Sequence, residues 1–206
     1  ACKLLQSLGA LDHNGRMTPH GQHMAILPLH PRLAHMVLKG KEETLGSLAC
    51  DLAAILSEGA LSKDSANPAQ ADLRTTVEAY YRQETVHTTT GVIQHLQKTS
   101  RDLQRVLHIT NSPTQKPSQI EKIGILLGLA YPDRIAQRQS DGKRQYKLTN
   151  GRLAYFHQPD ALEHEDYLVI IDLDGRQPIS RIYRAAPISY SELIAYYHDF
   201  IQTQEK

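Results

Sequence analysis

Cysteine is scarce in this chain, where only Cys2 and Cys50 occur. The two residues are far apart in the sequence, and neither takes part in a metal-binding spacing. This pattern favours reduced thiols on the apolar faces of helices, in a cytosolic protein, over a disulfide. Long apolar runs are missing too, since no stretch approaches the roughly twenty residues of a membrane span, and no signal peptide is present. We therefore expect a cytoplasmic location.

Charge of one sign is not in excess either, because the formal net charge is only +1. A value near zero neither requires nor excludes a nucleic-acid partner, so only the distribution of charge along the chain is informative. The length is typical of two small domains, each large enough to bury its own core.

The residue patterns of common active sites are also absent. The nearest approach to a phosphate-binding loop, residues 124–128, has the wrong spacing, no following Lys and an apolar interior typical of a helix. Asp12, Asp51 and Glu58 each stand without a positioned partner, and we find no Ser-His-Asp, Cys-His or paired-carboxylate constellation. The sequence predicts no catalytic, cofactor-binding or metal-binding residue.

What the chain does contain is organised around residues 8–38. Residues 8–12 are predicted to end an apolar helix, since Leu4, Leu5, Leu8 and Leu11 recur at helical spacing. Asn14-Gly15 then predicts a tight turn, because both residues tolerate positive φ. Thr18 is a predicted N-cap for a short helix with Pro19 in its first turn. Two prolines end that helix, and the next begins near Arg32.

Histidines crowd this segment at His20, His23, His30 and His35. The prolines between His23 and His35 argue against a convergent metal site, so we expect these histidines to be solvated or at helix ends.

Helical periodicity continues through residues 42–58, from Asp72 onward and from Val92 to Leu107, which predicts a small helical bundle. The polar, proline-containing segment 111–119 is a predicted linker. Ser118 and Glu121 have the spacing of a capping box for a helix over 120–130.

The period then changes from helix to strand. We expect strands at 134–139, 144–149, 152–156, 167–173 and 179–186, separated by Gly-containing turns and one acidic loop, as in a small barrel of OB type. A second capping box, Ser189 with Glu192, opens a terminal helix. The predicted fold class is α+β.

The strongest functional signal is a run of basic residues on the predicted barrel, opposed within its span only by Asp141. Cationic groups on such a barrel attract phosphates, and strand alternation should point about half of them the same way. The run consists of Arg134, Arg138, Lys143, Arg144, Lys147 and Arg152. Tyr146, Tyr155 and Tyr183 are candidates for stacking on bases, although alternation favours the core for each.

A second group of cations lies off the apolar stripes of the predicted bundle. Arg101 and Arg105 are four residues apart and therefore neighbours on one helix face, which places them slightly above Arg74, Arg82 and Lys98 as candidates.

Residues 8–38 resemble the segment that closes the winged-helix domain and opens the helical ratchet domain of DEAH-box-type helicases. They read LGALDHNGRMTPHGQHMAILPLHPRLAHMVL. Residues 129–139 (LAYPDRIAQRQ), 146–151 and 172–187 resemble, in the same order, the OB-fold domain of the HrpB branch of these bacterial ATP-dependent helicases. The resemblance divides the chain into a partial winged helix (1–31), a ratchet bundle (32–110), a linker (111–119), an OB-like domain (120–188) and a C-terminal helix (189–206).

The resemblance implies that the chain is a C-terminal piece of a longer helicase. ATP and magnesium would bind to RecA-like motor domains outside this sequence, and the piece alone should not hydrolyse ATP. Its expected partners are those motor domains and single-stranded RNA or DNA, with no membrane. The alternative is a protein-interaction module that docks a regulatory partner. A free-standing winged-helix repressor is disfavoured, because no recognition helix with base-reading side chains is visible.

Overall fold

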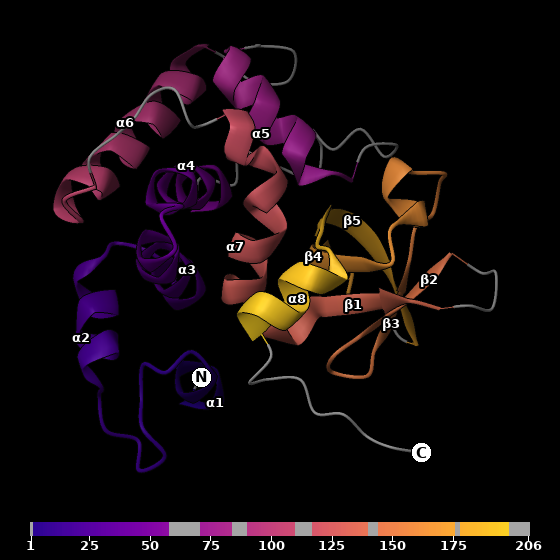
Figure 1. Ribbon diagram of the computed structural model, residues 1–206, viewed down its shortest axis with the longest axis horizontal. Helices are drawn as coiled ribbons and strands as arrows, with labels where there is room; N and C mark the ends of the chain where they lie inside the picture. Colours follow the sequence, from indigo (N-terminus) through magenta and orange to yellow (C-terminus); the bar gives the residue numbers. More distant parts are fainter. Residues whose placement is uncertain are drawn as a thin grey trace. The chain divides into compact units, whose positions relative to one another are not determined.

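The computed structural model describes residues 2–57, 71–83, 90–109, 117–139, 144–175 and 178–197. The chain forms two compact units (Figure 1). The first contains Ala1–Ser65 and Val77–Ile120, and the second contains Ala66–Thr76 and Glu121–Lys206. Helix α5 (Leu73–Arg82) begins in the second unit and ends in the first. The predicted range 32–110 thus includes a segment that belongs to the second unit.

The first unit starts with α1 (Cys2–Ser7), a turn and α2 (Pro19–Ile26). The turn forms as predicted, with Gly15 at φ 79 and an isolated antiparallel bridge between Leu11 and Met17. The Thr18 hydroxyl accepts a hydrogen bond of 3.0 Å from the Gly21 amide, so the predicted N-cap is confirmed.

Three further helices complete the bundle. Helices α3 (Pro31–Glu42), α4 (Gly46–Ser57) and α6 (Thr90–Val106) pack together with the end of α5 (Figure 1). Leu48, Leu52 and Ile55 of α4 are almost fully buried, as the apolar stripe predicts. The predicted start of α4 at residue 42 is wrong, because α3 continues to Glu42 and Thr44 takes a positive φ of 60 that breaks the helix.

Asp51 on α4 is not isolated, which corrects the sequence interpretation. Its side chain is buried and accepts hydrogen bonds from the hydroxyls of Ser100 (2.5 Å), Tyr81 (2.9 Å) and Tyr80 (3.3 Å). Burial and the nearby carboxylate raise the pKa of both tyrosines. The carboxylate therefore binds three helices of the bundle to one another. Asp12 also has partners, the amides of Asn14 and Arg16.

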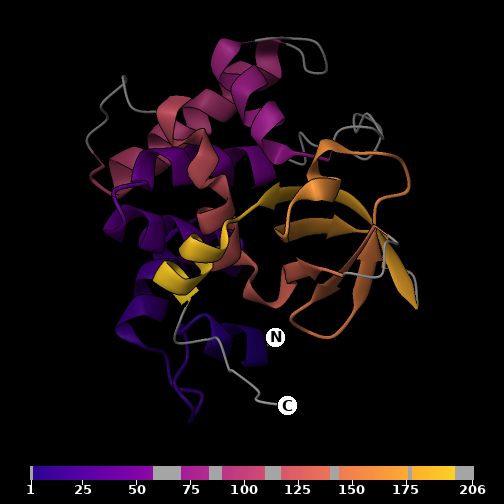
Figure 2. The same ribbon diagram turned by 45° about the vertical axis from the view of Figure 1, so that its right-hand side comes forward.

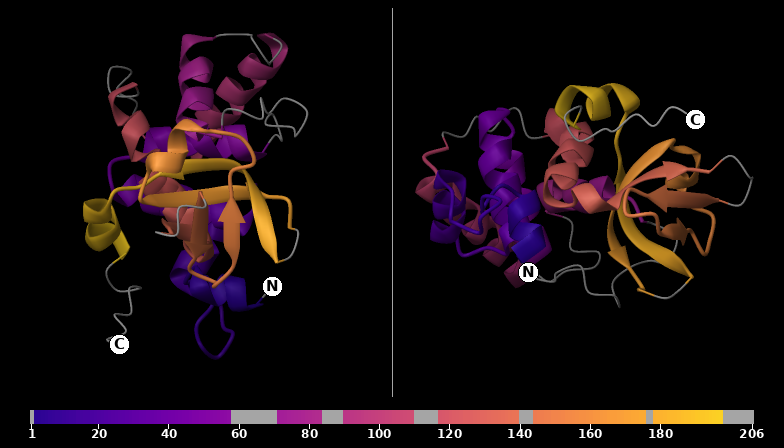
Figure 3. Two further views of the ribbon diagram at one scale, coloured as in Figure 1. Left: turned by 90° about the vertical axis from the view of Figure 1, so that its right-hand side faces the viewer. Right: turned by 90° about the horizontal axis from the view of Figure 1, so that it is seen from below.

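The second unit contains a closed five-stranded barrel in the order β1-β2-β3-β5-β4 (Figures 2 and 3). Its strands are β1 (Ile135–Arg138), β2 (Gln145–Leu148), β3 (Leu153–Tyr155), β4 (Tyr167–Leu173) and β5 (Ile179–Pro187). All neighbours are antiparallel except β3 and β5, which are parallel. Short 3-10 turns lie at η1 (Pro117–Lys122), η2 (Pro132–Arg134) and η3 (Ala161–His164).

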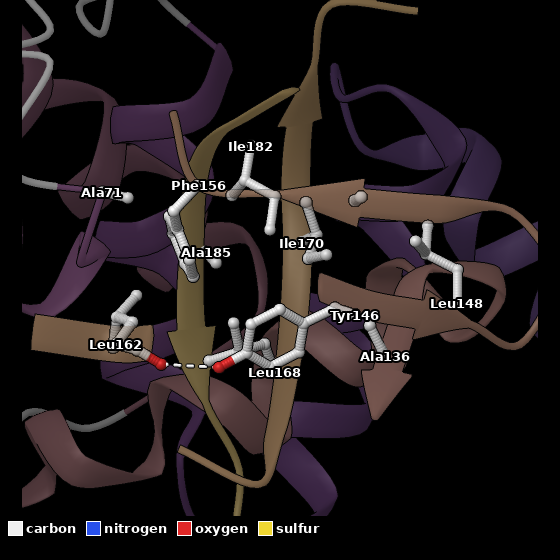
Figure 4. Close-up of a cluster of buried hydrophobic side chains, with 11 residues drawn as sticks. Ala71, Ala136, Tyr146, Leu148, Phe156, Leu162, Leu168, Ile170, Ile182 and Ala185 are labelled. Carbon is white, nitrogen blue, oxygen red and sulfur yellow. Dashed lines mark hydrogen bonds between the residues drawn. The ribbon is translucent and has the colours of Figure 1, made fainter. Parts of the chain in front are cut away.

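Tyr146 occupies the middle of the barrel core (Figure 4). It is fully buried, its ring meets Phe156 edge-on, and its hydroxyl donates to the carbonyls of Leu162 (2.8 Å) and Glu165 (2.9 Å). Ala136, Leu148 and Ile182 belong to the same buried cluster as Tyr146. The expectation that Tyr146 belongs to the core is confirmed.

Helices α7 (Ile123–Ala130) and α8 (Tyr190–Tyr197) lie on the same side of the barrel (Figure 3). The predicted capping box at Ser189 is confirmed, since Ser189 and Glu192 exchange hydrogen bonds with each other's amides. The other box is wrong as a helix start, because α7 begins at Ile123 after η1. Glu121 instead pairs with Arg74 Nη1 at 2.7 Å.

Ala71 and Asp72 also pack on the barrel, although the OB-like domain was predicted to start at residue 120. Ala71 accepts a hydrogen bond of 2.9 Å from the Ala185 amide on β5, and Asp72 forms an isolated parallel bridge with Ala185. The buried Asp160 carboxylate holds the Ala71 amide at 2.8 Å. Nothing in the composition of this segment predicts these contacts.

The predicted α+β class, helices followed by a small five-stranded barrel and a terminal helix, is confirmed. Cys50 is buried as expected, whereas Cys2 is exposed, and both are free thiols. In the described part of the chain no helix is both long and apolar enough to cross a bilayer.

Candidate nucleic-acid interface

The four arginines of the basic run are divided between the two ends of the barrel. Arg134 precedes β1 at the end where the turn between β2 and β3 lies, whereas Arg138 and Arg144 lie at the other end of these strands. The length of β1, four residues, separates the ends by about 13 Å. Lys143 lies outside the described residues. The run is therefore not one continuous surface patch.

At the first end, the two arginines make structural contacts. Arg134 donates to the Ile171 carbonyl, and its guanidinium lies 5.1 Å from the centre of the Tyr131 ring. Arg152 donates a hydrogen bond of 2.8 Å to the Ser180 hydroxyl across the parallel strand pair. Both guanidiniums thus help to close this end of the barrel.

At the second end, acidic residues from a distant part of the sequence face the arginines. Arg138 pairs with Asp166 at 2.9 Å, and Arg144 Nε lies 3.2 Å from Glu163. The side chains of Arg138 and Arg144 remain 42% and 51% exposed. Half-exposed pairs of this kind partly cancel the positive potential that the sequence suggested.

Among the described members of the run, Lys147 alone lies on the outer wall of the barrel. It alternates with buried Tyr146 and Leu148, and its side chain is exposed. Cross-strand register places it next to Gln137 of β1 and Leu153 of β3. Tyr155 and Tyr183 are the two other stacking candidates. Both are half-buried, and both occupy strand positions whose side chains face outward, as that of Lys147 does.

The bundle has its own cationic surface on α6. Lys98, Arg101 and Arg105 follow one another at spacings of three and four residues, and all three are exposed. Arg105 is 79% exposed and pairs with Asp102 at 2.9 Å, while Arg101 Nε donates to the Gln97 carbonyl of its own helix. We call these three residues the α6 stripe.

The two candidate cations of α5, Arg74 and Arg82, are engaged in ion pairs. Arg74 is held by Asp72 and Glu121, and its donation of hydrogen bonds to the Asp72 carboxylate is the main reason that its pKa is raised. Arg82 lies 3.6 Å from Glu78 one turn earlier. Within its unit Arg74 therefore acts as a structural residue rather than as a ligand contact.

The histidines of the organising segment differ from expectation. His20 Nε2 and His35 Nδ1 lie 2.8 Å apart, and the two rings meet edge-on. Burial lowers the pKa of both, that of His35 to about 4. The expectation of solvated or helix-end residues is wrong for His35 and confirmed for His30, whose ring accepts from the Arg32 amide at the start of α3. Among the described residues no group of His, Cys, Asp and Glu is arranged to hold a metal ion.

Sequence reasoning missed one surface residue, Arg181. Its guanidinium lies 5.0 Å from the centre of the Tyr183 ring, on the outer face of β5. The alternation of residues 179–183 on the predicted strand indicates that Arg181 and Tyr183 share one face. Arg181 was missed because it lies outside the basic run.

Comparison with known proteins agrees with this architecture. The family profile "Helicase associated domain (HA2), winged-helix" matches residues 1–29. The ATP-dependent RNA helicase HrpB of Escherichia coli is 31% identical over 196 residues, which are 94% of this chain and 21% of that protein. The probable ATP-dependent RNA helicase DHR2 of Saccharomyces cerevisiae is 43% identical over 53 residues, 26% of this chain and 7% of that protein.

Solved structures agree as well. The crystal structure of the E. coli DExH-box NTPase HrpB has a TM-score of 0.72 and 29% identity, and it covers 97% of this chain and 22% of that one. A second structure, titled as the E. coli DEAH/RHA helicase HrpB, has a TM-score of 0.68 and 26% identity over 91% of this chain and 21% of that one.

These findings define the class of protein: a helicase-associated region of the DEAH-box type. Such a region has a winged-helix part, a helical bundle and a small barrel. The chain belongs to the HrpB branch of that class, as the sequence resemblance predicted. It spans about a fifth of the length of the HrpB protein and structures that it matches.

Proposed function

We propose that this chain is the nucleic-acid-binding accessory region of a cytoplasmic ATP-dependent helicase. In this proposal it holds single-stranded RNA or DNA against RecA-like motor domains of the same parent protein, and ATP and magnesium bind in those motor domains. The helical bundle serves as the ratchet domain, and the barrel serves as an OB-type binding module. No chemical step is assigned to residues of this chain.

The observation that carries the proposal is the α6 stripe. Lys98, Arg101 and Arg105 present three cations along one helix face, in a chain whose relatives are named as RNA helicases. Cations at such spacing contact successive phosphates without reading bases, so binding should be tolerant of sequence. Asp102 pairs with Arg105 and so reduces the charge of the stripe at that position.

The test is fluorescence anisotropy of labelled single-stranded RNA and DNA across a salt series. We expect affinity to fall steeply with salt, and the slope gives the number of phosphates contacted. Replacing Lys98, Arg101 and Arg105 together by Gln should weaken binding by roughly tenfold and reduce the slope. A matched control is Lys3→Gln with Arg16→Gln and Lys41→Gln, which removes three exposed cations elsewhere in the same unit. Equal binding by the two triple variants would refute the role of the stripe.

A protein-interaction module is the second candidate, and the surface of α8 favours it. Tyr190 and Ile194, one turn apart, are 63% and 42% exposed, and the Tyr190 ring stacks on Tyr167 of β4. Binding of a partner through this surface should be insensitive to salt and should be lost in Ile194→Glu. Salt-sensitive oligonucleotide binding that Ile194→Glu leaves unchanged separates the first function from the second.

A further inference from the structure

The outer wall of the barrel over β2, β3 and β5 carries a mixed aromatic and cationic surface. Register aligns Gln145 with Tyr155, and Tyr155 with Arg181, so these three side chains form one row across the strands. Lys147 and Leu153 form the adjacent row. Their strand neighbours Tyr146, Ala154 and Ile182 point into the barrel core, which fixes the outward direction of both rows.

Arg181 neighbours two tyrosines of this surface. Tyr155 lies opposite it on β3, and Tyr183 lies two residues further along β5, with its ring 5.0 Å from the guanidinium. The His157 ring lies 6.5 Å from the Tyr155 ring at the end of β3. We call Tyr155, Arg181 and Tyr183 the stacking platform.

The platform differs from the two ends of the barrel in its charge balance. The arginines at the second end face Asp166 and Glu163, whereas no carboxylate lies within ion-pair distance of Arg181 or Lys147 in the part of the chain that the structure describes. Asp174 is close to Arg181, but its carboxylate accepts from the Arg181 backbone amide at 3.0 Å. The positive charge of this wall is therefore available to a ligand.

Helix α7 leaves the platform uncovered. It meets β5 at the opposite end of the strand, where Gly124 lies against the Pro187 carbonyl. Tyr155, Arg181 and Tyr183 are all only half-buried. Their planar groups are held by strands on one side and are accessible to solvent on the other.

We propose that the stacking platform binds the bases of single-stranded nucleic acid, with Lys147 in contact with the phosphates beside it. Planar tyrosine and guanidinium groups stack on any base, and a cation beside them attracts the backbone. The inference rests on the proposed function and adds a contact with bases to it. The platform lies on the outer wall of the barrel, apart from the two ends that carry the arginines of the basic run. The ligand class is single-stranded RNA or DNA with unpaired bases.

The direct test uses tryptophan as a reporter, because the chain contains none. Tyr155→Trp creates a single tryptophan on the platform, and Tyr190→Trp creates one on exposed α8 in the same unit as a control. A single-stranded oligonucleotide should quench the fluorescence of Tyr155→Trp and leave that of Tyr190→Trp unchanged. An abasic strand of equal length and charge should bind without quenching either variant.

Affinity measurements complete the test. Tyr155→Ala should weaken binding by roughly tenfold with an unchanged salt slope, whereas Tyr155→Phe should bind as the parent does. Absence of binding by the parent chain at low salt overturns the proposed function and the platform together. Binding by the parent chain that Tyr155→Ala leaves unaltered, without quenching of Tyr155→Trp, overturns the platform alone and leaves the proposed function standing.

Discussion

Ser100 on α6 donates a hydrogen bond of 2.5 Å to Asp51 on α4, and these residues are 49 positions apart in the sequence. Because Tyr80 and Tyr81 of α5 donate to the same carboxylate, three helices meet at one buried charge. Gln104 Nε2 donates to the Ser100 hydroxyl and extends this network along α6.

Replacing Asp51 should cost the bundle several hydrogen bonds at once. We expect Asp51→Ala to lower the free energy of unfolding by about 3 kcal/mol, because the hydroxyls of Ser100, Tyr80 and Tyr81 lose their acceptor. Ser100→Ala should cost about 1.5 kcal/mol. Urea denaturation measures both, with exposed Asp102→Ala on α6 as the control, which should change stability by less than about 0.5 kcal/mol. A loss in Asp51→Ala no larger than that of the control would contradict this role.

The pair of His20 and His35 predicts a loss of stability in acid. Burial, His20 and Lys39 lower the pKa of His35 to about 4, against 6.5 for an unperturbed histidine, while Glu42 and a hydrogen bond with the Leu8 backbone oppose the shift. The unfolded chain therefore takes up a proton that the folded chain does not, and stability is full above pH 6.5 and falls as the pH drops toward 4.

We expect the first unit to lose about 2 kcal/mol of stability across that range, since solvent around the partly exposed His35 ring screens its charge. His35→Gln, which cannot be protonated there, should remove most of this pH dependence. His13→Gln on the exposed turn is the matched control and should retain it. Thermal unfolding from pH 7 to 4 provides the measurement.

Two helical glycines should respond in opposite directions to alanine. A β-carbon on Gly124 of α7 would collide with the Pro187 carbonyl, so Gly124→Ala should destabilise the second unit by about 2–3 kcal/mol. Gly91 on α6 has nothing within 4 Å of that position, and Gly91→Ala should stabilise its helix by about 0.5–1 kcal/mol. Calorimetry distinguishes the two signs, and destabilisation by both variants would contradict the steric argument.

Asp166 should act as a local inhibitor of nucleic-acid binding. If Arg138 contacts phosphate, Asp166→Asn removes its competing carboxylate and should tighten oligonucleotide binding by roughly two- to threefold at low salt. Asp133→Asn, at the other end of β1, is a charge-matched control that should have a smaller effect. Unchanged affinity in Asp166→Asn would exclude Arg138 from the interface.

Local rules were sufficient to predict much of this fold. The Thr18 cap, the turn at Gly15 and the Ser189–Glu192 box each depend on residues within four positions, and all three form as predicted. The helix predicted to begin at the Ser118–Glu121 box starts instead at Ile123, and Glu121 binds Arg74, 47 residues away. A local pattern could not anticipate that competition.

The candidate site was less predictable for the same reason. Spacing alone placed six cations in one run, but strand register put Arg134 and Arg152 at one end of the barrel and Arg138 and Arg144 at the other. It also brought Asp166 and Glu163 against the second pair. Conversely, register aligned Tyr155 with Arg181, 26 residues later, although no motif joins them in the sequence. Cross-strand neighbours follow from topology, which a linear reading of charge does not contain.

The contact between Ala71 and β5 limits how this region can be exchanged between proteins. A recombination point in the segment 111–119, which composition marks as a boundary, would transfer the barrel without Ala71 and Asp72. The Ala185 amide and the Asp160 carboxylate would then lose the backbone groups that they bind. The barrel therefore cannot be transferred intact as a separate domain, and it should be passed on in evolution together with the helices that precede it in the chain.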